Sequence, residues 1–167
     1  MPAHLAIINP KSPQNMGSIL RASGCYQAQS IRYTGERYAR AKAFFTDTKN
    51  AHLKIEVKHV ANVIDANLDK QLTKVAVELV EGATPLPLFE HPENALYIFG
   101  PEDGSIEQDV IDQCDEVVYI PTVGCMNLAA TVNVLLYDRL AKTTAMPDDD
   151  EIIKNSRDTN NRTKSHS

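Results

Sequence analysis

Short runs of apolar residues recur along the chain, and proline, glycine or polar residues bound each run. Residues 4–9 and 95–100 are apolar over most of their length, which is typical of strands buried on both faces. Residues 55–60 instead alternate apolar and polar side chains, as a strand with one face in solvent does. The pattern therefore predicts strands over 4–9, 30–34, 55–60, 75–80, 95–100 and 116–121.

The helices show a different period. Leu128, Val132 and Leu135 recur at spacings of four and three residues, which predicts one helical face. Asn15 is expected to cap the first helix, because its side-chain oxygen can accept from backbone amides two or three residues on. Since helices alternate with strands, we expect an α/β fold with a mostly parallel sheet and helices on both faces. Helices are predicted over 16–28, 37–45, 63–72, 106–114 and 127–141, with a turn-rich link over 82–87.

The length and composition fit one ordinary domain. The chain has 167 residues, of which 43% are hydrophobic and 23% are charged. Residues 1–145 are expected to form this domain, and the polar composition of residues 146–167 predicts a mobile C-terminal tail. The apolar stretch from Leu128 to Tyr137 is far shorter than the ~20 residues that span a bilayer, so no membrane segment is predicted.

The cysteines and the N-terminal residues indicate a cytoplasmic protein. Cys25, Cys114 and Cys125 form an odd set without a Cys-x-x-Cys pair, which fits neither a secreted disulfide framework nor a zinc site. The first residues also lack the basic segment and apolar run of an export signal, because Pro10 and Pro13 interrupt the apolar stretch. We therefore expect a reducing cytoplasm and no metal.

The charge is unevenly distributed. Residues 1–60 contain nine Lys and Arg against three Asp and Glu, a net charge of +6. The other 107 residues contain eight against nineteen, a net charge of −11, so that the whole chain carries −5. A basic first third on an acidic body favours an anionic partner, although solvated charges without a partner produce the same asymmetry.

Three loops that follow predicted strands contain the candidate chemistry. They are residues 9–21, 99–104 and 120–128. In parallel α/β sheets, ligands bind beyond the carboxyl ends of the strands, where these loops lie. Taken singly, each loop has an ordinary structural explanation, since proline and glycine are common in loops and Asn15 and Asn127 are common helix caps.

The first predicted helix has a stripe of small residues around one arginine. Gly17, Arg21, Gly24 and Ala28 are spaced by four, three and four residues, so they share one face. Small neighbours allow another surface to approach closely around the Arg21 guanidinium. The alternative is an arginine in a surface ion pair, which the glycines of the stripe disfavour.

Three motifs occur in a fixed order along the chain. They are Asn-x-Gly-x-x-x-Arg over 15–21, Phe-Gly-Pro-Glu-x-Gly over 99–104, and Ile-Pro followed by Met-Asn-Leu over 120–128. Together they resemble the SpoU/TrmH class of the SPOUT RNA methyltransferases, most of all the minimal members without an added RNA-binding domain. The resemblance covers about residues 4–141. It implies an α/β knot whose loops hold S-adenosylmethionine, and a homodimer in which Arg21 of one protomer serves the cofactor of the other.

The same resemblance assigns roles residue by residue. Arg21 matches the catalytic arginine, and Asn15 matches the asparagine that supports it. Cys125 is a departure, because the family usually has a serine two residues before Asn127, and a thiol is a weaker hydrogen-bond partner than a hydroxyl. The positions that the resemblance places at the cofactor are Glu78, Gly100, Glu102, Ile120, Cys125, Met126 and Asn127.

The reaction implied by the resemblance is methyl transfer to a ribose 2′-hydroxyl of tRNA or rRNA. An arginine is a poor proton acceptor because its pKa exceeds about 12, so we expect Arg21 to hold a phosphate and stabilise alkoxide charge, with the proton acceptor left open. A base-methylating enzyme is the second hypothesis, but no carboxylate lies between Asn15 and Arg21 to act as a general base. A non-catalytic RNA-binding module is the third hypothesis, for which Cys125 is the only hint.

The basic first third is expected to follow the RNA backbone. Tyr33 and Tyr38 are expected either to stack on unpaired bases or to pack inside the protein. The residues predicted to contact RNA are Arg32, Arg37, Arg40 and Lys42, with Lys49, Lys54 and Lys58 along the same track.

Overall fold

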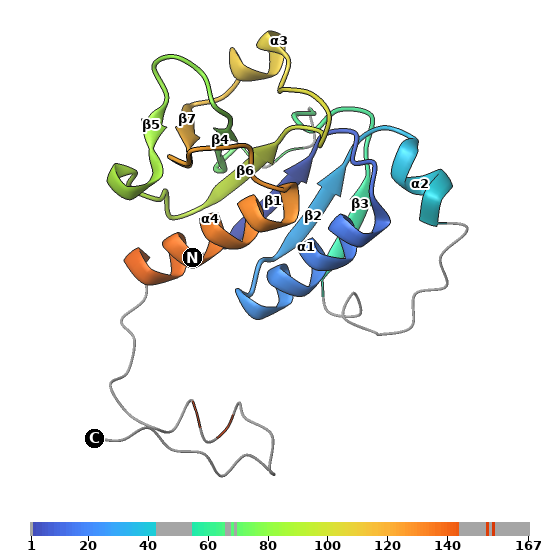
Figure 1. The fold of residues 1–167 in the computed structure, drawn as a ribbon, viewed down its shortest axis with the longest axis horizontal. Coiled ribbons are helices and arrows are strands. Elements are labelled where there is room, and N and C mark those ends of the chain that lie inside the picture. The colour runs from blue at the N-terminus through green and yellow to red at the C-terminus, as the bar shows by residue number, and fades with distance from the viewer. Residues whose placement is uncertain are drawn as a thin grey trace.

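The computed structural model describes residues 2–42, 55–65, 68, 70–143, 153 and 155. They form a seven-stranded, fully parallel sheet in the order β3-β2-β1-β6-β4-β7-β5 (Figure 1). The predicted α/β fold with a parallel sheet is thereby confirmed. The strands are β1 (Ala3–Ile7), β2 (Ser30–Tyr33), β3 (Glu56–His59), β4 (Thr73–Val77), β5 (Thr84–Pro85), β6 (Ala95–Phe99) and β7 (Glu116–Tyr119).

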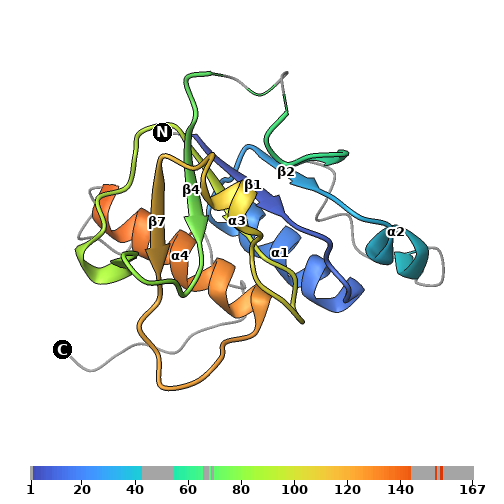
Figure 2. The ribbon, with the colours of Figure 1, turned by 90° about the horizontal axis from the view of Figure 1, so that it is seen from above.

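Two long helices, α1 (Pro13–Cys25) and α4 (Leu128–Thr143), lie side by side along one face of the sheet, as Figures 1 and 2 show. Leu5 of β1, Ile19 of α1 and Leu135 of α4 are fully buried in the core between these helices and the sheet. The apolar face of the last helix is therefore covered by the sheet of its own protomer. This face therefore gives no support to a dimer.

A second core lies on the opposite face of the sheet. Successive side chains of a strand point to opposite faces, so Ala6 of β1 and Ile98 of β6 point away from α1 and α4. They pack with Val63 and Ile106, which precede β4 and the short helix α3 (Gln108–Ile111) respectively. Because both faces are covered, the central strands read as continuous apolar runs.

The first helix begins and ends earlier than predicted. It begins at Pro13, whose missing N–H is no loss in a first turn, and Ser12 caps it, because the Ser12 hydroxyl accepts from the amide of Asn15 at 3.3 Å. The prediction that Asn15 is the cap is wrong. The helix ends at Cys25, and Gln27 then takes a φ of 57°, so that Ala28 is buried beyond the helix and does not belong to its exposed stripe.

The helix predicted over 63–72 is absent from the described residues of that range. These residues form bends and turns, and the apolar side chains of Val63, Ile64 and Leu72 pack against the sheet. Apolar residues at helical spacing therefore reached the core without a helical backbone. A chain held at both ends by strands of the sheet can bury its side chains in this way.

Several elements also begin or end at other residues than predicted. β4 begins at Thr73 instead of residue 75, because Thr73 pairs with Ala95 of β6, and it ends at Val77 instead of residue 80. α3 is shorter than the predicted 106–114. The predicted link over 82–87 contains β5 and the 3-10 helix η2 (Leu86–Leu88).

The helix predicted over 37–45 is described as α2 (Arg37–Lys42), and the rest of it lies outside the described residues. The same is true of the tail over 146–167, except for residues 153 and 155. The boundary at residue 145 thus stays a prediction. No helix in the part of the chain that the structure describes is long and apolar enough to cross a membrane.

Candidate functional site

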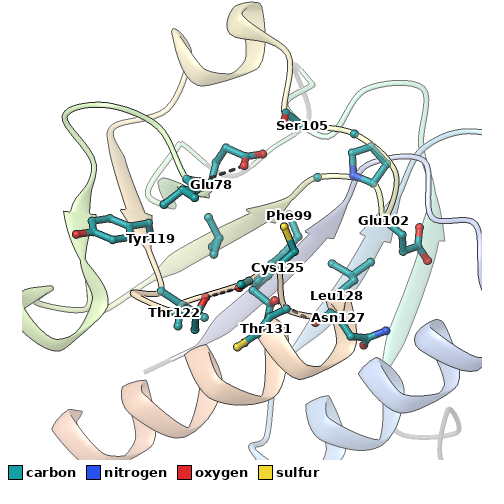
Figure 3. Close-up of a pocket in the computed structure, with 18 of the residues that line it drawn as sticks. Glu78, Phe99, Glu102, Ser105, Tyr119, Thr122, Cys125, Asn127, Leu128 and Thr131 are labelled. Carbon is teal, nitrogen blue, oxygen red and sulfur yellow. Dashed lines mark hydrogen bonds between the residues drawn. The ribbon is translucent and has the colours of Figure 1, made fainter.

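A pocket of about 650 Å³ opens where β4, β6 and β7 end (Figure 3). The loops after these three strands and the first turn of α4 form its wall, and α1 contributes one side chain, that of Asn15. The structure thus brings together every residue that the resemblance places at the cofactor. These residues are Glu78, Gly100, Glu102, Ile120, Cys125, Met126 and Asn127.

The Glu102 carboxylate joins the loop after β6 to the start of α1. Its Oε2 accepts from the backbone N–H of Lys11 at 2.8 Å, and its Oε1 accepts from the N–H of Ser12 at 3.0 Å and from Asn15 Nδ2 at 3.2 Å. Burial alone would raise the pKa of Glu102, but the hydrogen bonds outweigh it and lower the pKa. This glutamate therefore holds two loops together as a carboxylate.

Asn15 connects Glu102 to the start of the last helix. Its Oδ1 accepts from Asn127 Nδ2 at 2.9 Å, while its own Nδ2 donates to Glu102. The Oδ1 of Asn127 in turn accepts from the N–H groups of Ala129 at 2.9 Å and Ala130 at 3.3 Å, which caps α4. One amide thus fixes the position of two pocket loops relative to α1.

Gly100 and Glu78 lie against each other on another side of the pocket. A Cβ atom at Gly100 would come within 3.2 Å of the Ile106 nitrogen and 3.4 Å of Glu78 Oε2, so the backbone there is closely surrounded. Glu78 Oε2 accepts from the N–H of Ile106 at 2.9 Å, and Glu78 Oε1 accepts from the N–H of Leu79 at 3.0 Å. These bonds hold the loop after β4 against the segment before α3.

The loop over 120–127 is exposed and carries Cys125 on the pocket wall. Thr122 donates its hydroxyl to the carbonyl of Gly124 at 2.7 Å, which shapes the turn. The thiol of Cys125 makes no hydrogen bond with a described residue.

The hydroxyl groups of the pocket were not predicted from the sequence, because isolated Ser, Thr and Tyr residues form no motif. They belong to Ser105, Tyr119, Thr122 and Thr131.

Arg21 does not line this pocket. It lies on the exposed face of α1 between Gly17 and Gly24, and it makes no hydrogen bond or ion pair with a described residue. Asn15 and Arg21 are six residues apart, so about 9 Å of helix and a rotation of about 120° separate them. The structure therefore places the two predicted catalytic residues on different sides of α1.

The predicted RNA-contacting arginines differ in their surroundings. Arg32 is largely buried, donates to the carbonyl of Val63 at 3.1 Å and lies 3.7 Å from the Asp65 carboxylate. Arg37 donates to both carboxylate oxygens of Asp103, at 2.9 and 2.8 Å, and this hydrogen bonding raises the pKa of Arg37 and lowers that of Asp103. Arg40 is exposed. RNA contact by these residues stays a prediction.

The other predictions for the basic track have different outcomes. The stacking alternative for Tyr33 and Tyr38 is wrong: both side chains are buried and pack edge to face with ring centroids 5.1 Å apart. Lys58 pairs with Glu56 at 2.8 Å on the surface of β3. The side chain of Lys42 lies outside the described residues, as do Lys49 and Lys54.

The fold and the site define a class: a parallel α/β protein with a small-molecule pocket across the carboxyl ends of three neighbouring strands. The chain belongs to the SpoU rRNA Methylase family, whose model matches residues 2–137. Among curated proteins, it is 26% identical over 154 residues to the tRNA (cytidine-2′-O-)-methyltransferase TrmJ of Methanocaldococcus jannaschii. This match covers 81% of the chain and 66% of that relative.

Solved structures share the fold. An AdoMet-bound rRNA methyltransferase from Sinorhizobium meliloti has a TM-score of 0.69 at 18% identity, over 86% of this chain and 57% of that one. A structure described as giving insights into the 2-OH methylation of C/U34 on tRNA has a TM-score of 0.67 at 19% identity, over 84% of this chain and 89% of that one. The chain therefore spans between about half and nine tenths of these relatives.

Proposed function

We propose that this protein transfers a methyl group from S-adenosylmethionine to a ribose 2′-hydroxyl of tRNA or rRNA. The observation that carries the proposal is that all seven residues matched to the family's cofactor positions line one pocket. Family membership supports it, and so does the curated relative, which is named as a cytidine-2′-O-methyltransferase of tRNA. The α/β knot that the family resemblance implies belongs to the same proposal.

The pocket fits S-adenosylmethionine in size and chemistry. Its volume lies within the range of roughly 300–1,000 Å³ that is typical of small-molecule sites. Apolar side chains such as Phe99, Ile120 and Leu128 lie beside the hydroxyl groups of Thr122 and Thr131. The backbone at Gly100, Ile120 and Met126 would hold the cofactor, which supplies an activated methyl group when bound. The remaining task of the protein is to align the hydroxyl with that group and to assist loss of its proton.

Arg21 is the residue that we propose to act on the RNA. Its guanidinium is a poor base, but it can hold a phosphate by two parallel hydrogen bonds and stabilise negative charge on the attacking oxygen. Arg21 does not line the pocket of its own protomer, because it lies on the exposed face of α1. Asn15, on the pocket side of α1, acts as a positioning residue that fixes Glu102 and Asn127.

We further propose a homodimer in which Arg21 of one protomer completes the pocket of the other. Gly17 and Gly24 leave the face around Arg21 open to close approach, and the neighbouring α4 exposes Val134 and Tyr137. A twofold contact would use the same patch on both chains. In this arrangement, Arg21 of each protomer lies at the cofactor pocket of its partner.

The reaction is tested by incubating the protein with labelled S-adenosylmethionine and total RNA from a strain that lacks it, followed by nucleoside mapping. We expect label in a 2′-O-methylated nucleoside. Label in a base would favour the base-methylating alternative. RNA binding without any incorporation would favour the binding module. Fractionation of cells that contain the protein tests the proposed cytoplasmic location.

The composite site is tested by co-expressing Arg21→Ala with Gly100→Trp, each inactive alone. Trp at position 100 would fill the pocket, where even a Cβ atom comes within 3.2 Å of Ile106. A mixed dimer would contain one site with both defects and one with neither, so we expect activity to return. Mixed dimers that form by native mass spectrometry but remain inactive would show that Arg21 acts within its own chain.

The basic track is tested by comparing variants of two arginines, one exposed and one paired with a carboxylate. Arg40→Gln removes an exposed charge, and we expect it to weaken RNA binding at every sequence and to reduce the salt dependence. Arg37→Gln removes a charge that Asp103 already pairs, so a smaller change in the salt slope is expected. Equal salt slopes for wild type and Arg40→Gln would identify Arg40 as a solvated charge only.

A further inference from the structure

The pocket wall has an unusual charge for a site that is expected to hold a cofactor with a carboxylate group. Two of its side chains, Glu78 and Glu102, are carboxylates. Of the described residues that line the pocket, none is Lys, Arg or His. The wall of one protomer therefore favours cations, because no positive side chain offsets these two negative groups.

The two carboxylates differ in what they face. Glu102 is directed to the start of α1, where Lys11, Ser12 and Asn15 donate to it. Glu78 has two backbone donors, one to each oxygen, and each oxygen keeps a second lone pair. Figure 3 shows its side chain projecting from the end of β4 toward the segment of Ser105. Glu78 is thus a fixed negative charge on the pocket wall.

We propose that Glu78 makes the pocket select a sulfonium cofactor over its neutral thioether product. This inference rests on the proposed function. S-adenosylmethionine and S-adenosylhomocysteine share the adenosine, the ammonium and the carboxylate, and they differ by one methyl group and one positive charge. Contacts to the shared parts bind both ligands equally. A fixed carboxylate on the wall acts on the difference, because it attracts the sulfonium and has no such attraction for the thioether.

The consequence for turnover concerns product release. Transfer of the methyl group leaves the sulfur with its electron pair and without its charge, while the hydroxyl proton passes to an acceptor. The attraction between Glu78 and the sulfur is lost at that moment. Glu78 thereby weakens product binding relative to cofactor binding, and it acts as a specificity-determining residue without a part in the bond changes.

The test is calorimetric titration of the full-length protein with S-adenosylmethionine and, separately, with S-adenosylhomocysteine. We expect Glu78→Gln to lower the preference for S-adenosylmethionine about five- to tenfold, through weaker binding of the cation with little change for the neutral ligand. Glutamine keeps an oxygen that can accept from Ile106 N–H, so the loop contact is retained. Glu78→Asp keeps the charge and should keep most of the preference.

The matched control is Glu81→Gln, which removes the same charge three residues away at an exposed position that does not line the pocket. It should leave the preference unchanged. Equal weakening of both ligands by Glu78→Gln would overturn the proposal and make Glu78 a loop contact only. A salt series on the wild type gives a second measurement: the preference should fall as salt rises, and a constant preference would also overturn the proposal. If the folded wild type binds neither ligand, the proposed function itself fails.

Discussion

Two groups of polar side chains lie at opposite ends of α4, one open to the pocket and one closed. The open group is the pocket junction of Asn15, Glu102 and Asn127, which joins loops at the carboxyl ends of strands. The closed group lies beneath α4, where the ring of His91 is fully buried between Tyr97 and Asp138. Their difference separates the residues that build a site from the residues that hold the fold.

The side chains of the closed group form hydrogen bonds with one another and with backbone carbonyls. Arg139 donates to the Tyr97 hydroxyl at 2.7 Å and to the carbonyls of Pro92 and Glu93 at 2.7 and 2.8 Å. The His91 ring lies 2.7 Å from the Tyr97 hydroxyl and 2.9 Å from Asp138. Because Asp138 can only accept as a carboxylate, His91 Nε2 carries the proton and Nδ1 accepts from Tyr97.

Burial dominates the titration of this closed group. It raises the pKa of Tyr97 to about 12, although Arg139 opposes the shift. It also lowers the pKa of His91, although the hydrogen bond and charge of Asp138 act in the other direction. The pocket junction behaves differently, since hydrogen bonds outweigh burial at Glu102. We therefore expect substitutions in the closed group to cost stability and substitutions in the junction to cost activity.

The largest expected effect is on stability in the closed group. Arg139→Met keeps the bulk of the side chain but leaves the Tyr97 hydroxyl and two carbonyls without their donor. We expect a loss of about 3–5 kcal/mol in the free energy of unfolding, measured by urea denaturation. Arg40→Met, at an exposed position, is the control and should change it by less than about 0.5 kcal/mol. Similar losses in both variants would remove the distinction between the two groups.

The second effect is on activity in the open junction. Asn15→Ala removes the amide that joins Glu102 to Asn127, so two pocket loops lose their common support. We expect methyl transfer to fall about a hundredfold, since small misplacements of reacting groups have effects of this size. Unfolding in urea should show a loss of no more than about 1 kcal/mol. Full activity with a large loss of stability would contradict the comparison.

A third, smaller effect is the pH dependence of stability. The lowered pKa of His91 means that the folded protein favours the neutral ring, so the unfolded chain takes up the proton first. Stability should therefore fall as the pH falls below the ordinary His pKa of about 6.5. Glu102, whose pKa is also lowered, contributes a loss only at more acidic pH, below about 4.

This effect is measured by urea unfolding at pH 7.5 and pH 5.5 in wild type and in His91→Gln. We expect the difference between the two pH values to be smaller in the variant, because its side chain does not titrate. The other groups that face His91 are Tyr97, Asp138, Arg139 and Lys142, and they are common to both proteins. An equal pH difference in wild type and variant would show that His91 does not control it.

The smallest effect is expected at Cys125 on the open side. Its exposed thiol makes no hydrogen bond with a described residue, so a serine hydroxyl in its place has no packing to disturb. Cys125→Ser should retain activity within about twofold and stability within about 0.5 kcal/mol. Activity assays and thermal melts check both values. An inactive but stable variant would show that the thiol has a specific role in the pocket.

Much of the architecture could be predicted because strands that are buried on both faces appear in the sequence as continuous apolar runs. The runs around Leu5 and Ile98 predicted the central strands, and the motifs around Gly100 and Asn127 predicted the pocket. The segment over 63–72 could not be predicted, because apolar spacing reports burial and does not report backbone conformation. Ser12 displaced Asn15 as the cap because Pro13 is well suited to the first turn.

Long-range pairs account for the other differences. Arg37 Nη1 donates to both carboxylate oxygens of Asp103, which lies 66 positions away in the sequence, and no local pattern predicts this pair. The network of His91 with Asp138 likewise depends on the packing of α4 beneath the sheet. Composition correctly indicated a basic first third, but it could not show which of its arginines are already paired with carboxylates.

The position of β6 has a consequence for how the chain is made. β6 lies between β1 and β4, so Ala3 and Thr73 both have Ala95 as their partner in the sheet. While the ribosome has supplied only the first 80 or so residues, β1 has one unpaired edge and β4 has no partner strand. Synthesis of β6 joins them, and α4 covers the joined face only later. A chain stopped before β6 should therefore aggregate instead of folding to half of the protein.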